Sequence, residues 1–330
     1  MLKKMIISGT FIVMLCSAQG FAKEPLQPLT IQLEWLPHVG FAGVLLAKKQ
    51  GWYEEAGIDL TIKTWELNMS PIEEVLTGKA QIGIEQGADI IKARSKGKKI
   101  RAVATLFQKS PACLISKKKL GIKTPEQLRG KRVGIYHPSA ILMVKIVLTD
   151  VRMKYDDIIP IEVGWNIQSL LDDTTDVHPG FMNDQPLSIK ERGYETNVIP
   201  AFKHGYDFYS GVYFVTDTMI QKQPQLIQAF LNVTLRGWRE AFKTPLATAQ
   251  MIVAEYYPEG SVQQQTESLK IFHTLATVGL VLGDSMIGIM EGRFWAKGVD
   301  ILYKYKQIDK KIPVTDLFTL DFLKNITTSR

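Results

Sequence analysis

Three side chains suited to ligand binding stand close together near the amino terminus: Glu34, Trp35 and His38. A carboxylate accepts hydrogen bonds, an imidazole donates or accepts one, and an indole offers a flat face on which a heterocycle can stack. The alternative for Trp35 is a core residue that covers the end of a sheet. For Glu34 it is a buried partner of a backbone or arginine group. We predict that all three contact a ligand.

The elements expected around these residues place them at one edge of a sheet. A strand begins at Ile31, an apolar helix follows at 41–47, and an alternating strand covers 58–64. A strand, helix and strand of this length predict neighbouring parallel strands. Ligands on such sheets bind beyond the carboxyl ends of the strands, which is where the first strand delivers Glu34 and Trp35.

The alternation of strands and helices runs through two series, which predicts an α/β fold with two doubly wound lobes. The first series ends with a strand at 100–107, and the second runs from 112 to 201. We assign 23–107 and 211–330 to lobe 1, and 108–210, with the two hinge crossings, to lobe 2. Small-molecule sites favour such inter-domain positions, and hinge closure is a known mode of ligand capture.

A loop at 136–140 precedes an almost wholly apolar helix at 139–151, which we expect to be buried. Pro138 has no N–H and the loop has no glycine, so it is poorly suited to hold an anion at the start of the helix. Ser139 either offers its hydroxyl to a ligand or caps the helix.

The sequence offers little for other kinds of chemistry. Phosphate-loop, dinucleotide and serine-hydrolase motifs do not occur. The histidines His178, His204 and His273 are isolated, so we predict no metal site and no cofactor. The net charge is +7, but the basic runs at 96–99 and 117–119 contain no aromatic residues, which argues against nucleic-acid binding.

Residues 1–22 have the pattern of a secretory signal peptide: two lysines, an apolar run and a small-residue region ending at Ala22. The apolar run is short for a membrane anchor. Cleavage after Ala22 would deliver a periplasmic chain with a net charge of about +5, because Lys3 and Lys4 are removed. Cys113 would be its only cysteine, so stability must come from core burial rather than from a disulfide.

Several motifs, in the same order along the chain, resemble one known family. They are EWLP at 34–37, AG at 42–43, KQGWYEEAGI at 49–58, QKSP at 108–111, LRGKRVG at 128–134, TLRGW at 234–238, LF at 317–318 and DFL at 321–323. The family comprises the thiamine-pyrimidine-precursor synthases and the related periplasmic substrate-binding proteins. The resemblance implies a type II periplasmic-binding-protein fold, and for most bacterial members an ABC importer.

Within this family, two positions distinguish the synthases from the binding proteins. The synthases use a cofactor-bearing lysine and a sacrificial histidine, where this chain has Glu85 and Asp89, and they also carry a cysteine cluster that is absent here. Neither carboxylate can form a Schiff base or donate an imidazole ring. We therefore predict that the chain is not an enzyme, and we assign Glu85 and Asp89 to the ligand site.

The segment at 181–186 matches the family's ligand-contacting Asn-Asn/Asp-Glu-Pro motif with departures. Asn183 is retained, whereas Gln185 replaces an acid that accepts hydrogen bonds from an amino-substituted ring in pyrimidine binders. Gln185 keeps an acceptor and adds a donor. For both residues the alternative is a cap of the loop. His38 stands where binding-protein relatives often carry asparagine.

These observations predict a monomeric periplasmic solute-binding protein that delivers a thiamine pyrimidine precursor, or a similar small heterocycle, to an ABC permease in the inner membrane. A carrier of a sulfonate, nitrate or similar nutrient is the alternative within the same class. A ligand-sensing subunit of a membrane receptor is the alternative from another class.

Overall fold

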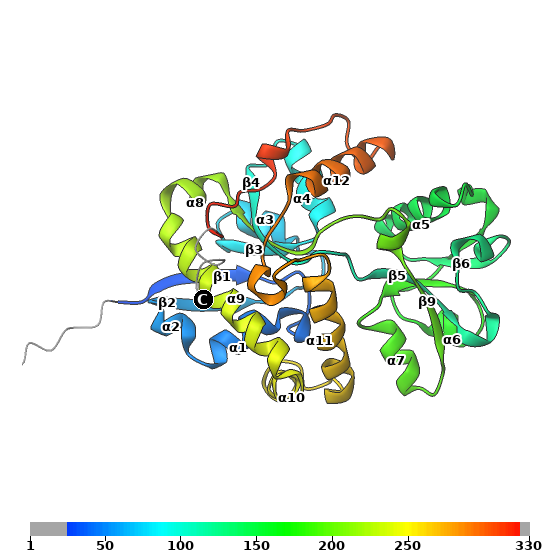
Figure 1. Ribbon diagram of the computed structural model, residues 1–330, viewed down its shortest axis with the longest axis horizontal. Helices are drawn as coiled ribbons and strands as arrows, with labels where there is room; N and C mark the ends of the chain where they lie inside the picture. The colour runs from blue at the N-terminus through cyan, green and yellow to red at the C-terminus, as the bar shows by residue number, and fades with distance from the viewer. Residues whose placement is uncertain (1–24, 324–330) are drawn as a thin grey trace, which may run out of the picture.

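The computed structural model describes residues 25–323, which form two lobes (Figure 1). The predicted signal peptide, residues 1–22, lies outside the described residues. Lobe 1 contains strands β1–β4 and β10, and lobe 2 contains β5–β9. The prediction of an α/β fold with two lobes is confirmed, whereas the residue bounds that we gave for the lobes stay a prediction.

Lobe 1 is built on a five-stranded sheet in the order β2-β1-β3-β10-β4. Its strands are β1 (Gln27–Gln32), β2 (Ile58–Lys63), β3 (Ile82–Glu85), β4 (Ile100–Phe107) and β10 (Ser210–Thr216). Strand β1 pairs in parallel with β2 and β3, as the first strand, helix and strand predicted. Strand β10, which returns from lobe 2, pairs antiparallel with β3 and β4.

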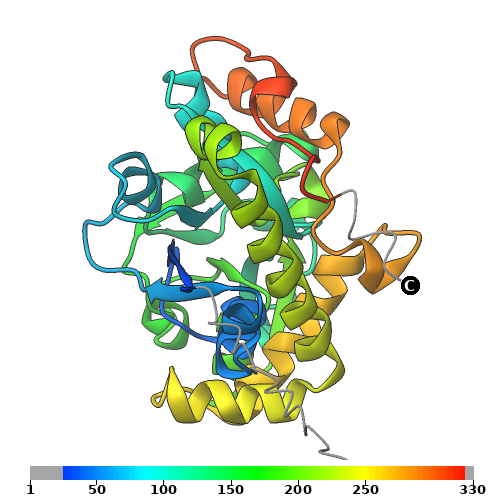
Figure 2. The same ribbon diagram turned by 90° about the vertical axis from the view of Figure 1, so that its left-hand side faces the viewer.

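Helices cover this sheet and complete lobe 1. They are α1 (Ala42–Lys49), α2 (Trp52–Glu55), α3 (Pro71–Leu76), α4 (Gly87–Ser95), α8 (Asp217–Lys222), α9 (Pro224–Lys243), α10 (Pro245–Glu255), α11 (Val262–Thr277) and α12 (Gly292–Lys304). In Figure 2, α9 runs along one face of the lobe, with α12 above it and α10 below. The sequence of α9 is amphipathic, and its apolar stripe is buried.

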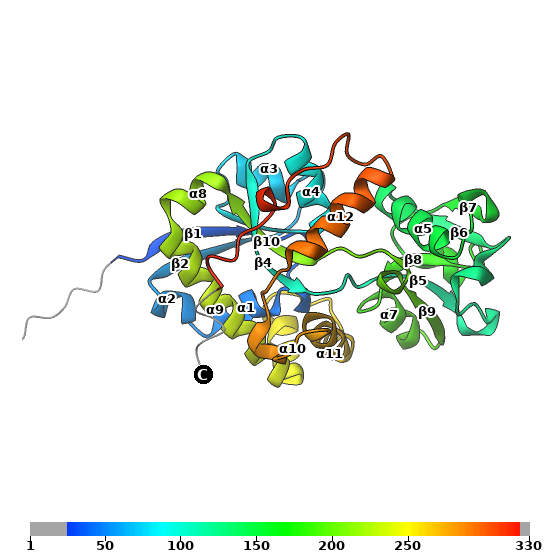
Figure 3. The same cartoon turned by 45° about the horizontal axis from the view of Figure 1, so that its top comes forward.

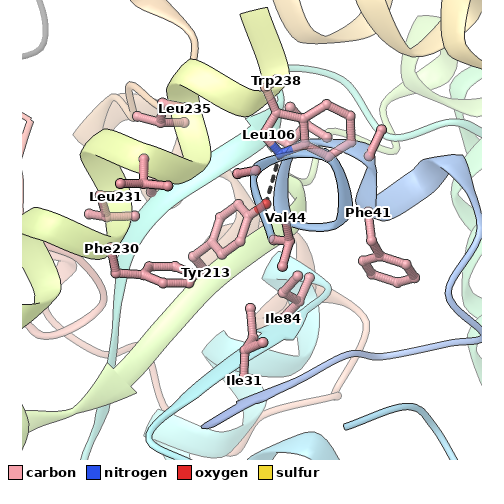
Figure 4. Close-up of a cluster of buried hydrophobic side chains, with 14 of the residues drawn as sticks. Ile31, Phe41, Val44, Ile84, Leu106, Tyr213, Phe230, Leu231, Leu235 and Trp238 are labelled. Carbon is pink, nitrogen blue, oxygen red and sulfur yellow. Dashed lines mark hydrogen bonds between the residues drawn. The ribbon is translucent and has the colours of Figure 1, made fainter. Parts of the chain in front are cut away.

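The core of lobe 1 contains an internal hydrogen bond between two large aromatic side chains. The indole Nε1–H of Trp238 donates to the hydroxyl of Tyr213 over 2.8 Å, and both residues are almost fully buried (Figure 4). Trp238 and Tyr213 are therefore both core residues.

Helices α1 and α9 approach each other closely through glycine. A Cβ atom on Gly237 would lie 2.0 Å from the carbonyl oxygen of Gly43, and one on Gly43 would lie 2.3 Å from the Trp238 ring. Only glycine fits at both positions, so the two helices pack as a rigid pair.

Lobe 2 combines a three-stranded sheet in the order β8-β5-β9 with the parallel pair β6-β7. Its elements are β5 (Ala112–Lys117), β6 (Arg132–Ile135), α5 (Pro138–Asp150), β7 (Ile159–Glu162), α6 (Gln168–Leu171), β8 (His178–Phe181), α7 (Gln185–Glu191) and β9 (Thr196–Pro200). Strand β5 enters from lobe 1 and is antiparallel to both of its neighbours. Pro179 lies within β8, which is an edge strand of its sheet, as expected for a residue with no N–H.

Two segments connect the lobes, one from β4 to β5 and one leading into β10 (Figure 3). Asp207, on the second segment, is buried and forms ion pairs with Lys109 on the first segment and with Lys297 of α12. The Nζ atom of Lys109 also lies 4.7 Å from the ring centroid of Phe294. Both crossings are thereby fixed to each other and to lobe 1.

Candidate ligand-binding site

The carboxyl ends of β1 and β3 bring two predicted site residues together. In the parallel register of these strands Gln32 lies opposite Gly83, so the chain places Glu34 beside Glu85 two residues further on. Asp89 lies in the first turn of α4, which follows β3 directly. Between them, the side-chain amide of Gln86 donates to Glu34 Oε2 over 2.7 Å. We call Glu34, Glu85 and Asp89 the acid cluster.

Glu34 and Glu85 hold their protons more tightly than free carboxylates do. Burial raises the pKa of Glu34 from its ordinary value of 4.5 to about 7, although the hydrogen bond from Gln86 opposes this rise. Burial, together with the negative charges of Glu34 and Asp89, raises the pKa of Glu85 well above its ordinary value. Carboxyl groups that keep their protons can both donate and accept a hydrogen bond, which suits the edge of a polar ring.

Four aromatic side chains form a continuous row across the two lobes, which we call the aromatic bridge. Trp35 and Trp65 come from lobe 1, with ring centroids 4.8 Å apart. Tyr136 and Trp165 come from lobe 2, with ring centroids 4.6 Å apart. The rings of Trp35 and Trp165 meet across the lobes at a centroid distance of 6.4 Å. Trp35 is 40% exposed and Trp165 is 58% exposed, so both retain open ring surface.

The spacing between Trp35 and Trp165 is slightly shorter than an intervening ring needs. A flat ring stacked between two others needs about 7–8 Å between the outer rings, because each stacking contact takes about 3.5–4 Å. The two indoles stand at 6.4 Å with a tilt of 33°. Opening the lobes by about 1 Å at this point would admit an aromatic ligand.

The start of helix α5 contradicts one of the two roles that we expected for Ser139. Helix α5 begins at Pro138, and its N-cap is His137, whose Nδ1 accepts from the Ser139 N–H over 3.2 Å. The expectation that Ser139 caps the helix is therefore wrong, because Pro138 fits the first helical position and the cap lies two residues earlier, at His137. The Ser139 hydroxyl lies 2.8 Å from the same Nδ1. With Pro138 lacking an N–H and the Ser139 N–H already bonded, this helix start has little to offer an anion.

The turn between β8 and α7 contains the other two predicted residues of lobe 2. The amide oxygen of Gln185 accepts from the Phe181 N–H over 2.7 Å, and its amide nitrogen donates to Asp184 Oδ2 over 2.9 Å. Both ends of the Gln185 side chain are thus bonded within the turn. Asn183 is only 7% exposed, and its Oδ1 atom is buried with no hydrogen-bond partner.

His38 lies apart from the aromatic bridge. Its Nδ1 accepts from the Gly40 N–H over 2.8 Å, which caps the short 3-10 helix Val39–Phe41. The ring packs on Phe41 and Tyr257, at centroid distances of 5.4 and 6.2 Å. Burial lowers the pKa of His38 to about 4, so the ring is neutral near pH 7. Its Nε2–H remains as a donor.

The residues predicted for the site from the sequence do not include Trp65, Gln86, Tyr136 or Trp165. A common signal links the aromatic ones: Trp65, Tyr136 and Trp165 each follow the carboxyl end of a strand, after β2, β6 and β7. An aromatic residue one to three positions beyond a parallel strand would therefore have been the pattern to look for.

The thiol of Cys113 is not available for chemistry at this site. Cys113 is fully buried, and burial raises the pKa of its thiol. Within residues 25–323 we find no group of three or more His, Cys, Asp or Glu side chains that could hold a metal ion. In the same part of the chain, helices of the length and apolar character needed to span a bilayer are absent.

Solved structures with the same fold are numerous. The periplasmic aliphatic sulphonate binding protein SsuA from Escherichia coli matches with a TM-score of 0.70 and 14% identity, covering 88% of this chain and 91% of that chain. The desulfurization enzyme DszB matches with a TM-score of 0.62 and 13% identity, covering 91% of this chain and 98% of that chain. Binding proteins and an enzyme thus share this fold.

Sequence relatives include proteins named as carriers and as synthases. The riboflavin-binding protein RibY of Chloroflexus aurantiacus is 22% identical over 315 residues, covering 92% of this chain and 88% of the relative. The formylaminopyrimidine-binding protein of Halalkalibacterium halodurans is 21% identical, covering 67% and 68%. A 4-amino-5-hydroxymethyl-2-methylpyrimidine phosphate synthase of Legionella pneumophila is 24% identical, covering 63% and 67%.

The family comparison agrees with the motifs noted in the sequence. The family described as NMT1/THI5 like matches residues 38–248, which is more than half of the chain. The chain therefore belongs to the NMT1/THI5-like family, as its motifs predicted.

Proposed function

We propose that this protein is the periplasmic solute-binding component of an ABC importer, and that it captures a flat nitrogen heterocycle between its lobes. The observation that carries the proposal is the approach of Trp35 and Trp165 from opposite lobes to a centroid distance of 6.4 Å, which a small opening of the lobes would widen enough for a flat ring. The relatives named for riboflavin and for a formylaminopyrimidine support a heterocyclic ligand.

In this proposal the acid cluster determines which polar groups the edge of the ligand can carry. The carboxyl oxygens of Glu34 and Glu85 can accept hydrogen bonds from ring N–H or amino groups, and these side chains bring no positive charge to a sulfonate, nitrate or phosphate. The anion-binding alternative is further weakened at the start of α5, where Pro138 has no N–H and His137 occupies the Ser139 N–H. A carrier of small anions therefore ranks below a carrier of heterocycles.

Two heterocycles compete for the site, and we favour a fused ring of the riboflavin type. The row of four aromatic side chains from Trp65 to Tyr136 is longer than a single pyrimidine ring needs. The relative named for riboflavin also matches over 92% of this chain. The thiamine pyrimidine precursor that the sequence predicted is the second candidate, because its amino group suits the acid cluster.

We further propose that the protein acts as a monomeric carrier and not as a synthase. Glu85 and Asp89 stand where the synthases carry their cofactor-bearing lysine and sacrificial histidine, and here they form part of the acid cluster. Export with cleavage after Ala22 would place the carrier beside an inner-membrane permease. A receptor in place of the permease is the alternative partner.

Titration of the purified protein with four ligands tests the proposal. Riboflavin, hydroxymethyl-pyrimidine, its phosphate and an alkanesulfonate would each be followed by calorimetry and tryptophan fluorescence. We expect riboflavin to bind most tightly and to quench fluorescence, with the phosphate and the sulfonate binding weakly. Preference for the sulfonate would overturn the proposal, and preference for hydroxymethyl-pyrimidine would select the second candidate.

A further inference from the structure

The start of α11, in lobe 1, contacts α7, in lobe 2, at both ends of α7. The amide nitrogen of Gln264 donates to Asp184 Oδ1 over 3.1 Å, and the hydroxyl of Ser261 donates to Glu191 Oε1 over 2.6 Å. Asp184 is the N-cap residue of α7 and Glu191 is its last residue. Figure 1 shows these two helices facing each other between the lobes. These contacts exist only while the lobes are together.

The Gln264 contact leads directly into the turn that contains Asn183. Asp184 accepts from Gln264 with one oxygen and from the Gln185 amide with the other, and Gln185 in turn accepts from the Phe181 N–H. A series of three hydrogen bonds therefore runs from lobe 1 to the end of β8. The turn is tightly packed, because a Cβ atom on Gly180 would lie only 2.7 Å from Gln185 Oε1.

The same turn contains a buried acceptor that lacks a partner. The Asn183 side chain is 7% exposed, and its Oδ1 atom makes no hydrogen bond. A buried polar atom of this kind is costly to leave unpaired, so its presence calls for a donor that arrives from elsewhere. A heterocyclic N–H is such a donor, and this step rests on the proposed function.

We propose that Gln264 is a positioning residue that couples lobe closure to ligand recognition by fixing the turn Phe181–Gln185, so that Asn183 Oδ1 receives a ligand N–H. When the lobes separate, Asp184 loses its donor from lobe 1 and the turn loosens. Closure restores the contact and fixes the position of the buried Asn183 oxygen. Opening of the lobes thereby weakens the hold on the ligand and favours its release.

Substitutions on one turn of α11 test the proposal with a matched control. Gln264→Ala should weaken riboflavin binding about two- to ten-fold, mainly through faster dissociation, because one hydrogen bond is lost. Gln263→Ala changes an exposed neighbour on the same turn and should leave binding unchanged. Equal affinities and dissociation rates for the two variants would overturn the coupling.

Exchanging the donor Gln264 and the acceptor Asp184 distinguishes a loss of this hydrogen bond from a general loss of stability. Gln264→Glu puts a second carboxylate against Asp184, so affinity should fall at pH 8 and recover towards pH 5, where the pair shares a proton. Adding Asp184→Asn reverses the direction of the hydrogen bond and should restore affinity at pH 8. Failure of the double variant to recover, with an unchanged melting temperature, counts against the proposal.

Hydrogen exchange without ligand tests the coupling even if riboflavin is the wrong ligand. Gln264→Ala should speed amide exchange in the peptide containing Phe181 and Gln185, whereas Gln263→Ala should not. Asn183→Leu should raise the melting temperature while abolishing ligand binding, because it removes an unpaired buried acceptor. A lower melting temperature for Asn183→Leu would show that the Asn183 oxygen serves the fold instead.

Discussion

Lys109 and Asp207, one on each segment that joins the lobes, form an ion pair with 3.0 Å between Lys109 Nζ and Asp207 Oδ1. The second oxygen of the same carboxylate pairs with Lys297 of α12. The Asp207 side chain is 8% exposed, whereas those of Lys109 and Lys297 are 29% and 54% exposed. One buried carboxylate therefore ties both crossings to lobe 1.

Asp207→Ala should loosen the connection between the lobes. It leaves two lysines facing each other without a counter-charge, so we expect the free energy of unfolding to fall by about 1–3 kcal/mol. Small-angle scattering of the ligand-free variant should show a larger radius of gyration than the wild type. Lys311→Met, which breaks the exposed pair of Lys311 with Asp300, is the control and should cost about 0–1 kcal/mol. An unchanged scattering curve for Asp207→Ala would contradict a hinge role.

Trp165→Ala and Trp35→Ala should each weaken ligand binding by about 1–3 kcal/mol, because each removes one face of the proposed stack. Both residues retain exposed ring surface, so stability should change little. Isothermal calorimetry with riboflavin gives the affinities. Tyr303→Ala removes a comparably exposed aromatic ring far along the chain, on α12, and should have no effect. Unchanged affinity in both tryptophan variants would place the ligand elsewhere.

The acid cluster should make stability depend on pH. The pKa of Glu34 is raised from 4.5 to about 7 by burial, so between these values the folded protein binds more protons than the unfolded chain. Stability should therefore fall as pH rises from about 4.5 to about 7. Glu34→Gln should flatten this part of the curve, as measured by urea unfolding at several pH values. Glu126→Gln, which changes a carboxylate on the surface of lobe 2 whose pKa is lowered, should leave the falling slope in place.

Tyr213→Phe should lower stability without changing ligand affinity. The substitution leaves the buried Nε1–H of Trp238 without an acceptor, and an unsatisfied buried donor costs about 1–3 kcal/mol. Thermal unfolding and calorimetry would be measured side by side. A change in affinity as large as the change in stability would show that Tyr213 reaches the site after all.

The sequence was sufficient to predict two α/β lobes, although the first strand begins at Gln27 and ends at Gln32, earlier than the predicted start at Ile31 implied. It also placed Glu34 near the sheet edge, since the first strand and its crossover helix were clear. It did not reveal that Glu34 and Glu85 are neighbours, because that depends on the register of β1 with β3, and no local pattern records which strands pair.

The side-chain roles within the site were harder to predict than the backbone. The cap of α5 moved from Ser139 to His137, since Pro138 accepted the first helical position. Gln185 was expected to contact a ligand or to cap a loop. Both its amide oxygen and its amide nitrogen form hydrogen bonds to neighbouring residues, Phe181 and Asp184. Such choices depend on rotamers and on the nearest unpaired N–H, which composition and spacing do not specify.

The buried, inert thiol of Cys113 has a practical consequence. In the mature chain that we predict, Cys113 is the only cysteine, and its burial and raised pKa protect it from alkylating reagents. A cysteine introduced at Leu67, a 78% exposed position two residues from Trp65, would then be the single thiol that a maleimide dye labels. The native protein is therefore a ready scaffold for a fluorescent biosensor, with no competing cysteine to remove first.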